Sequence, residues 1–238
     1  MWLRSACKLD HIYSINSIGL QQVTHTKLLG VIISQNMSQS LHCDYITSLG
    51  RKQVFLLLNA FRYSNLDTMT ALYKTYVRPL LEYSTAAWSP HLLSDIDKIE
   101  SVQRFFTRSL AGMSSLTYCE RLSKLGLQSL EERRIFNDCL YIFKLLHGHV
   151  NIKFTGLFTF TSNVISTNMA LRRNNSLLLY IPKFNIDAYE HCFALRAARY
   201  WNVLHDNIVL SNSVHSFCNH LLTFDFSVLL RGRAVTRL

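Results

Sequence analysis

One stretch contains the spacing of apolar residues that decides the fold: Leu66-Asp-Thr-Met-Thr-Ala-Leu-Tyr-Lys-Thr-Tyr-Val-Arg-Pro-Leu-Leu-Glu-Tyr83. Its large apolar residues recur at intervals of three and four, which is the period of a helix that buries one face. Pro79 lies inside this pattern, where it lacks a backbone donor and its ring clashes with the preceding turn. We therefore predict a helix over residues 66–81 that kinks at the proline or ends near Arg78.

Helical periods continue on both sides of this stretch. A dense apolar face runs from Leu41 to Phe61, and three further apolar faces follow residue 94. Each of these three begins with a hydroxyl three residues before a carboxylate, which is the signature of a capped helix start. The pairs are Ser94 with Asp97, Thr117 with Glu120, and Ser129 with Glu132. Because such faces must be buried against one another, residues 41–150 are predicted to form a helical bundle.

The segments that flank the bundle have other patterns. Residues 1–40 contain the short apolar runs Tyr13–Ile15, Leu20–Val23 and Leu28–Ile33, which predict a small β unit. Residues 151–176 are rich in Asn, Thr and Ser, and predict a linker. Residues 177–238 predict a small α+β extension, with a strand over Leu177–Ile181, helices near 188–204 and 213–222, and a basic tail at 231–237. The expected fold class is therefore mainly α.

Composition narrows the class of protein and of partner. Hydrophobic residues make up 49% of the 238 residues and charged residues 17%, which excludes a disordered chain. The formal charge of +10 indicates a polyanionic partner, nucleic acid before a membrane surface, although many basic proteins bind nothing specific. No apolar run approaches the roughly 20 residues of a membrane span. No signal-peptide core follows Met1, so we expect an intracellular protein without a membrane partner.

The sequence offers no self-contained active site. No Asp-Asp dipeptide is present, and Asp95 and Asp97 lie at an expected helix start, where the helix dipole favours negative charge. His215, Cys218 and His220 lie close together, but their spacing matches no standard zinc site. We therefore expect no catalytic residue, no metal site and no cofactor in this chain.

Two arginines form the most informative charge pattern. Arg104 and Arg108 are four residues apart, so they share a helix face beside Phe105 and Phe106. Such a stripe can follow the phosphates of a nucleic acid, and each contact adds salt-dependent affinity. A solvated helix face without a ligand has the same spacing, and spacing alone favours that alternative.

Several longer blocks occur in one order between about residues 20 and 222. They are Lys27-Leu-Leu-Gly-Val31 with Leu41-His42, Leu72-Tyr-Lys-Thr-Tyr-Val-Arg-Pro-Leu-Leu-Glu-Tyr83 with Trp88-Ser-Pro90, Asp95-Ile-Asp-Lys-Ile-Glu-Ser-Val-Gln-Arg104, Tyr118-Cys-Glu-Arg-Leu-Ser-Lys-Leu-Gly-Leu127, Ser129-Leu-Glu-Glu-Arg-Arg134, Phe193-Ala-Leu-Arg-Ala-Ala-Arg-Tyr-Trp-Asn-Val-Leu204 and Ser213-Val-His-Ser-Phe217. Together they resemble the reverse transcriptases of jockey-like LINE (non-LTR) retrotransposons. Leu28 stands where the family has Tyr, His205 stands where it has Pro, and the spacing before Leu41 differs.

The resemblance implies the last palm strand, a helical thumb and a carboxyl-terminal extension. The family's fingers and its catalytic Phe/Tyr-x-Asp-Asp box have no counterpart here, so it implies no polymerase activity for this chain alone, although the parent enzymes use Mg²⁺. In the full enzyme the strand around Leu29-Gly30 would lie near the primer end, and the thumb would grip the template–primer duplex. The candidate nucleic-acid contacts are Lys27, Gly30, Arg51, Lys52, Arg104 and Arg108.

The block from Val77 to Trp88 also has a purely structural interpretation. Arg78, Glu82, Tyr83 and Trp88 would then form a kinked helix that is fixed by an Arg78–Glu82 ion pair and by aromatic packing. We favour that interpretation over a catalytic one.

Two hypotheses of different class follow. The first is a truncated reverse-transcriptase remnant that binds RNA–DNA or DNA duplexes weakly and without sequence preference. The second is a helical interaction protein with no nucleic-acid role. Under either hypothesis the strand Leu28–Ile33 lacks a large sheet to cover it, and its apolar side chains and free edge predict self-association.

Overall fold

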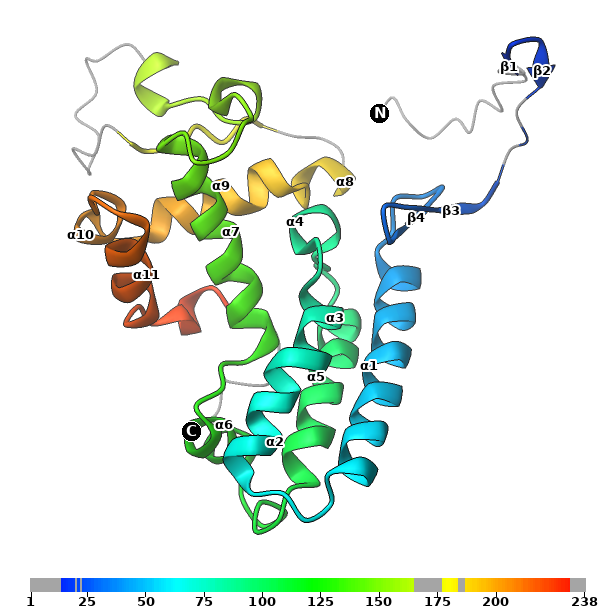
Figure 1. The fold of residues 1–238 in the computed structure, drawn as a ribbon. Helices are drawn as coiled ribbons and strands as arrows, with labels where there is room; N and C mark the ends of the chain where they lie inside the picture. The colour runs from blue at the N-terminus through cyan, green and yellow to red at the C-terminus, as the bar shows by residue number, and fades with distance from the viewer. Residues whose placement is uncertain (1–13, 20, 22, 165–176, 184–186, 232–238) are drawn as a thin grey trace.

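The computed structural model describes residues 14–19, 21, 23–164, 177–183 and 187–231. Its helices form two groups, and one long helix, α7 (Leu130–Leu146), runs from the first group into the second (Figure 1). The fold is mainly α, as predicted. The strands of the described residues form two separate two-stranded hairpins near the amino-terminal end.

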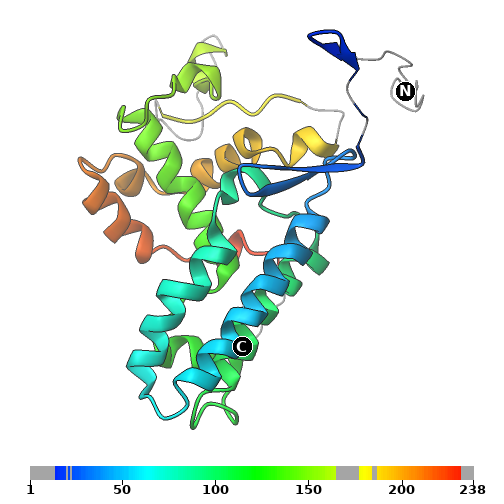
Figure 2. The same ribbon diagram turned by 45° about the vertical axis from the view of Figure 1, so that its right-hand side comes forward.

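The first group is a bundle built around α1 (Ser40–Ala60) and α5 (Leu93–Arg108), which lie side by side in two views (Figure 1, Figure 2). Gly50 allows α1 to approach its neighbours closely. A methyl group added there would lie 2.8 Å from Leu81 Cδ2 and 3.2 Å from Val102 Cγ1. The largest fully buried side chains of this core are Trp88, Tyr73, Phe106, Leu81, Ile99, Met113 and Leu130.

The stretch with Pro79 stays helical from residue 66 to residue 82, but its hydrogen-bond pattern changes on the way. α2 (Leu66–Leu72) is followed by one π-helical turn, η1 (Tyr73–Val77), and then by α3 (Arg78–Glu82). The N–H of Arg78 donates to the carbonyl of Tyr73, five residues back. This bulge lies directly before the proline and is one of the ways in which a helix absorbs such a residue. The helix therefore does not end near Arg78.

Two of the three predicted capping boxes are confirmed. Thr117 and Ser129 accept from the backbone N–H groups of Glu120 and Glu132, whose carboxylates accept from the N–H groups of the cap residues. These boxes start α6 (Tyr118–Leu125) and α7. Gly126 ends α6 in the left-handed conformation, as its position predicted.

The capping box predicted at Ser94 is wrong. α5 begins one residue earlier, at Leu93, and no side chain caps its first turn. The carboxylate of Asp95 instead accepts from Ser40 Oγ at 2.6 Å and from Lys98 Nζ at 3.2 Å. Tertiary packing against the start of α1 therefore set this helix terminus, and a local pattern could not predict it.

The run Leu28–Ile33, predicted as one strand, turns back on itself. β3 (His25–Leu28) pairs antiparallel with β4 (Val31–Ser34), and Leu29 and Gly30 form the two-residue turn. Both turn residues have positive φ, 47° and 88°, which is the requirement of a tight hairpin turn of the primed type. Leucine is uncommon at such a position, so only Gly30 signalled the turn.

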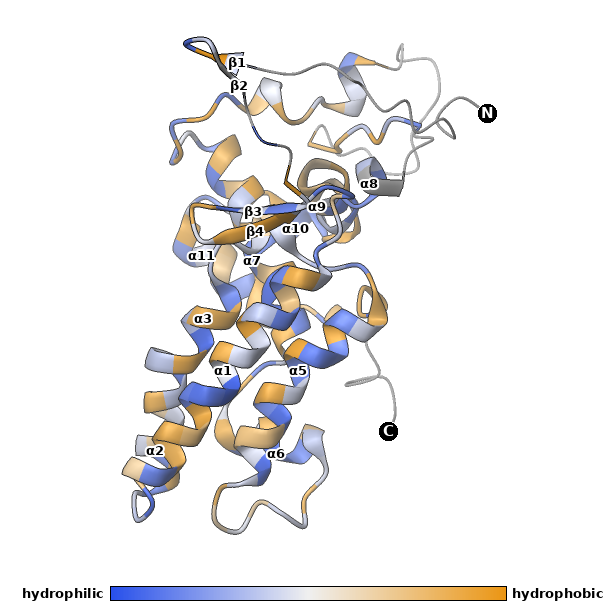
Figure 3. Cartoon of the chain, turned by 90° about the vertical axis from the view of Figure 1, so that its right-hand side faces the viewer, coloured by the Kyte–Doolittle hydropathy of each residue, from blue (hydrophilic) through white to orange (hydrophobic). Residues whose placement is uncertain are grey.

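The β3–β4 hairpin also changes which apolar side chains of residues 28–33 are exposed, compared with the single strand that was predicted. Val31 is buried in the bundle core and Ile33 packs against it, so this face is covered. The exposed apolar side chains are those of Leu28 and Leu29, which are 58% and 84% exposed. In Figure 3, β3 is largely blue (hydrophilic) and β4 is largely orange (hydrophobic).

The first hairpin is shorter than predicted. β1 (Ser14–Ile15) pairs with β2 (Ile18–Gly19), and the turn residues Asn16 and Ser17 have positive φ. The predicted second strand began at Leu20, which lies outside the described residues together with Tyr13 and Gln22. Gln21 and Val23 are not in a strand.

The second group surrounds the carboxyl-terminal part of α7. It contains α8 (Asp187–Glu190), α9 (Phe193–Val203), α10 (Asp206–Val209) and α11 (Val214–Leu222). Three 3₁₀ turns complete it: η2 (Phe154–Gly156), η3 (Thr161–Asn163) and η4 (Phe226–Val228). The rings of Phe143 and Phe217 stack at 4.3 Å in the centre of its core.

The two hydrophobic cores meet within α7. Leu130 belongs to the first core, whereas Ile135 and later residues of the helix belong to the second, so the division lies before the boundary expected at residue 150. Phe158, in the segment expected to be a linker, is buried in the second core. Within the described residues, the strand expected over 177–181 forms one antiparallel bridge, Phe160 with Leu179. Residues 165–176 of that linker and 232–237 of the basic tail lie outside the described residues.

Candidate nucleic-acid interface

The tip of the β3–β4 hairpin is held against the end of α3. The hydroxyl of Tyr83 donates to the carbonyl of Leu29 at 3.2 Å. A side chain at Gly30 would bring a Cβ to 3.3 Å from Tyr83 Cε1, so glycine is required there by the close contact as well as by its φ. The candidate residue Gly30 therefore shapes the tip, and the side chain that projects from the tip is Leu29.

Lys27 is tied to α1 rather than extended into solvent. Its Nζ donates to the hydroxyl of Tyr45 at 2.9 Å and lies 4.6 Å from the centre of that ring. Beside it, the N–H of Ile32 donates to Nδ1 of His42, and burial lowers the pKa of this imidazole, which favours the neutral form that accepts the bond. Lys27 is exposed, so its remaining N–H groups still face water.

Arg51 and Lys52 lie on the outer face of α1, next to α5. Arg51 Nη2 donates to Ser101 Oγ at 2.9 Å, and Ser40 at the start of α1 contacts Asp95 near the start of α5. The two helices therefore run in the same direction. Both cations are exposed, and neither forms an ion pair with a carboxylate among the described residues.

Arg104 and Arg108 lie one turn apart on α5, but Arg104 is half-buried and Arg108 is exposed, and they differ in their partners. Arg104 Nη2 pairs with Asp97 Oδ1 at 2.9 Å, and its guanidinium lies 5.6 Å from the centre of the Tyr118 ring. Arg108 is exposed and has no ion-pair partner in the described part of the chain. The positive charge available to a ligand on α5 is therefore mainly that of Arg108.

Exposed aromatic rings accompany these cations. Phe105 on α5 is 47% exposed, whereas Phe106 is fully buried in the core. On α1, Phe55 is 62% exposed, one turn beyond Arg51, and Leu56 is also exposed. In Figure 3, orange (hydrophobic) and blue (hydrophilic) helical turns alternate along α1 and α5. Sequence reasoning missed Phe55 because it read the whole apolar face of residues 41–61 as buried; the signal was the position of Phe55 four residues after Arg51.

We use the name α1–α5 strip for Arg51, Lys52, Phe55, Phe105 and Arg108. Three uncompensated cations and two open aromatic rings can bind a polyanion through its charge and through its planar groups. The neighbouring charges largely neutralise one another, because Lys98 pairs with Asp44 at 2.9 Å and with Asp95 at 3.2 Å.

A buried polar network lies under the strip and fixes α5 to α6 and α7. The Tyr118 hydroxyl donates to Glu100, and the N–H of Leu130 donates to the same carboxylate at 3.0 Å. Gln103 accepts from the Tyr73 hydroxyl at 2.9 Å and donates to the carbonyl of Gln128 at 2.9 Å. Burial raises the pKa of Glu100, while its hydrogen bonds with Tyr118 and Leu130 oppose that shift.

The ion pair expected in the block around Pro79 is present, and Glu82 has a second partner as well. Glu82 receives two hydrogen bonds from Arg133 on α7, one of them at 2.9 Å from Nη2, while Arg78 Nε lies 3.9 Å away. Trp88 is buried and its indole donates to the carbonyl of Tyr83 at 2.7 Å. The spacing of four residues correctly predicted the pair of Arg78 with Glu82, and the fold adds Arg133 from another helix.

Within the described residues, no group of three or more His, Cys, Asp or Glu side chains could hold a metal ion. Nor does any helix of the described residues have the length and apolar character to cross a membrane.

No family model and no solved structure matches this chain. It is similar to an uncharacterized protein of Caenorhabditis elegans, B0403.1, with 24% identity over 123 residues. The match covers 50% of this chain and 62% of that relative, so the chain spans about three-fifths of the relative's length. The name of the relative assigns it no activity.

Proposed function

We propose that this chain is a nucleic-acid-binding module of the reverse-transcriptase thumb type, which holds a duplex against the α1–α5 strip and does not itself polymerise. The observation that carries the proposal is the set of exposed cations Arg51, Lys52 and Arg108, which have no carboxylate partner among the described residues. The sequence blocks that resemble retrotransposon reverse transcriptases support it, because that family grips the template–primer duplex with its thumb.

The dimensions of the strip suit a nucleic-acid backbone. Arg51 contacts Ser101, and Arg108 lies seven residues further along α5. At about 1.5 Å per residue this distance is roughly 10 Å, which corresponds to about three phosphates of one strand along the duplex axis. The phenyl rings of Phe55 and Phe105 can contact sugars or unpaired bases between these points.

Salt dependence of duplex binding tests the proposal. Three or so phosphate contacts predict weak binding of an RNA–DNA hybrid, with a log–log slope against salt of roughly −3. The double variant Arg51→Gln and Arg108→Gln should reduce the magnitude of that slope by about 2. The matched control, Lys153→Gln and Lys183→Gln, removes two exposed charges outside the bundle and should leave the slope unchanged. Equal slopes for the two variants, or no binding at low salt, would contradict the proposal.

A second candidate function, association through the β3–β4 hairpin, rests on a separate observation. A mainly apolar hollow of about 230 Å³ lies beside the hairpin and is lined by Leu28, Leu29, Met37 and Trp88 among others. A second copy of the chain would cover the exposed leucines. In sedimentation experiments the wild type should then self-associate, and Leu28→Gln with Leu29→Asn should be monomeric, since Asn tolerates the positive φ of residue 29. A wild-type protein that sediments as a monomer would contradict this second candidate function.

A further inference from the structure

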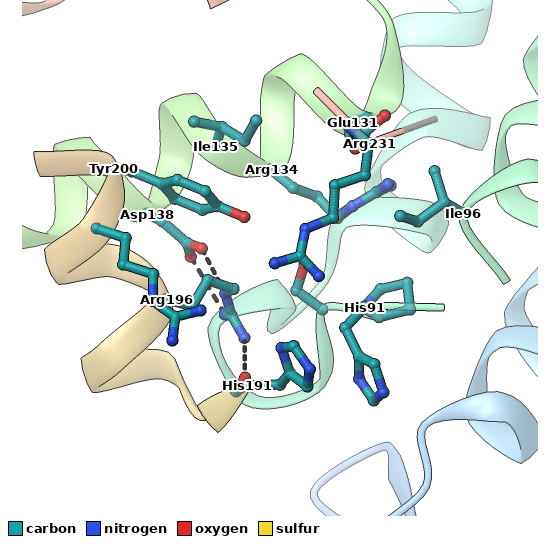
Figure 4. Close-up of a pocket in the computed structure, with 13 residues that line it drawn as sticks. His91, Ile96, Glu131, Arg134, Ile135, Asp138, His191, Arg196, Tyr200 and Arg231 are labelled. Atoms are coloured by element: carbon teal, nitrogen blue, oxygen red, sulfur yellow. Dashed lines mark hydrogen bonds and ion pairs between the residues drawn. The ribbon is translucent and has the colours of Figure 1, made fainter. Parts of the chain in front are cut away.

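A small polar cavity lies where the two groups of helices meet. It is enclosed by the connection between α4 (Thr85–Trp88) and α5, by α7, by α9 and by the segment that follows η4 (Figure 4). Its volume is about 30 Å³. The charged side chains that line it are Arg134, Arg196, Arg199, Arg231, Glu131 and Asp138. Two of these arginines have carboxylate partners, since Arg196 pairs with Asp138 and Arg199 pairs with Glu190.

The Arg134 guanidinium is the unusual feature of this cavity. Arg134 is 3% exposed, and neither Nη1 nor Nη2 has a hydrogen-bond partner among the described residues. Leaving two guanidinium nitrogens buried without an acceptor is unfavourable, although the carboxyl groups of Glu100 and Asp138 interact electrostatically with this cation. An acceptor placed in the cavity would satisfy these hydrogen bonds.

The two carboxylates that line the cavity accept hydrogen bonds from other donors, and the carboxyl group of Glu100, which interacts electrostatically with Arg134, accepts from Tyr118 and Leu130. Asp138 accepts from Arg196 Nε at 2.8 Å, which the dashed lines of Figure 4 mark. Glu131 Oε1 accepts from the backbone N–H of Arg231 at 2.7 Å. Arg196 is in turn held by the carbonyls of Ala86 and His191.

Two histidines add further donors at the mouth of the cavity. The rings of His91 and His191 stack at 3.9 Å, and Figure 4 shows them side by side at the edge of the cavity, away from Arg134. The Nδ1 atom of His91 is buried and has no hydrogen-bond partner in the described part of the chain. Arg134 and His91 both line this cavity with unpartnered nitrogens, and guanidinium and imidazole groups are donors that can bind a tetrahedral oxyanion.

We propose that this cavity binds a phosphoryl group, with Arg134 as the principal donor and His91 as a second one. A water molecule needs roughly 10–15 Å³. The cavity of about 30 Å³ therefore has room for a ligand the size of two or three water molecules, but not for a base or a sugar. The group is either free phosphate or the terminal phosphate of a nucleic-acid strand. The site does not include the α1–α5 strip, and the inference does not depend on duplex binding there.

Phosphorus NMR with inorganic phosphate, at constant ionic strength set by chloride, tests the site. We expect line broadening and saturable binding with the wild type. Arg134→Gln should weaken binding roughly tenfold or more, because it removes charge-assisted hydrogen bonds. The control Lys153→Gln should bind like the wild type. Equal binding by the wild type and Arg134→Gln, or no saturable binding by the wild type, would overturn the proposal and leave water as the occupant.

A second variant covers the case in which Arg134→Gln does not fold. His91→Ala should lower phosphate affinity several-fold, and an unchanged affinity in that variant would overturn the assignment of His91 and Arg134 to one site. Competition separates the two sources. If a 5′-phosphorylated dinucleotide displaces inorganic phosphate and its 5′-hydroxyl counterpart does not, the strand terminus is the ligand; if neither does, free phosphate is. A folded Arg134→Gln variant should keep the salt slope of duplex binding, so failure of this site and failure of the α1–α5 strip are distinguishable.

Discussion

The two cores of this protein are held together by different means. In the first, a hydrogen-bonded network of Tyr73, Gln103, Tyr118 and the carboxyl group of Glu100 is buried beneath α5. In the second, stacked aromatic rings surround α7, and one buried ion pair, Asp138 with Arg196, faces the junction. The first arrangement positions α5 and the strip on its surface, whereas the second docks the extension. Because α7 contributes to both, the first bundle and the second group of helices are joined through one continuous helix.

The largest effect that tests this comparison is the loss of an aromatic side chain from the second core. Phe143→Ala should lower the free energy of unfolding by about 3–5 kcal/mol, since Phe143 is fully buried and stacked on Phe217. The matched change in the first core, Phe106→Ala, should cost a similar amount. If α7 couples the cores, each variant melts in a single circular-dichroism transition. Two separate transitions, with only one of them shifted, would show that the cores unfold independently.

A smaller effect concerns the buried carboxylate of the first core. The pKa of Glu100 is raised in the folded state, so proton binding stabilises the fold. The contribution of Glu100 to stability is therefore complete below its unfolded pKa of about 4.3 and is lost as the pH rises through the folded value. The stability of wild type relative to Glu100→Gln should decline between pH 4 and pH 7, as measured by urea unfolding. A difference that is constant or rises with pH would contradict this assignment.

The smallest effects compare the helix termini. Thr117→Ala and Ser129→Ala remove caps that the structure confirms, and each should cost about 0.5–2 kcal/mol. Ser94→Ala should change stability by less than about 0.5 kcal/mol, because Ser94 lies inside α5 and caps nothing. Urea titrations of the three variants give the comparison directly. If Ser94→Ala lowers the free energy of unfolding as much as Thr117→Ala does, then Ser94 caps α5 as the sequence predicted.

The helices could be predicted because their evidence is local. The apolar period placed α1, α2 to α3, α6 and α7 within one or two residues, and the hydroxyl–carboxylate spacing located two caps. The hairpin turn at Leu29 was missed because a leucine with positive φ carries no turn signal of its own. The cavity around Arg134 could not be predicted, since His91, Arg134, His191 and Arg231 are far apart in the sequence and meet only in the folded chain.

The candidate interface shows the same limit. Spacing placed Arg104 and Arg108 one turn apart on α5, but Arg104 is half-buried and paired with Asp97, which leaves Arg108 as the more available charge. The contribution of α1 to this surface depends on the packing of α1 alongside α5, which the contact of Arg51 with Ser101 defines. No pattern within either helix contains that information.

Lysine footprinting tests the central claim most directly. Lys52 lies on the α1–α5 strip, while Lys153 and Lys183 are exposed elsewhere. The protein is treated with an acylating reagent in the presence and absence of an RNA–DNA hybrid, and the modified lysines are quantified by mass spectrometry. If the strip holds the duplex, Lys52 is protected, and Lys153 and Lys183 react at unchanged rates. Undiminished reactivity of Lys52 at saturating hybrid would contradict the account.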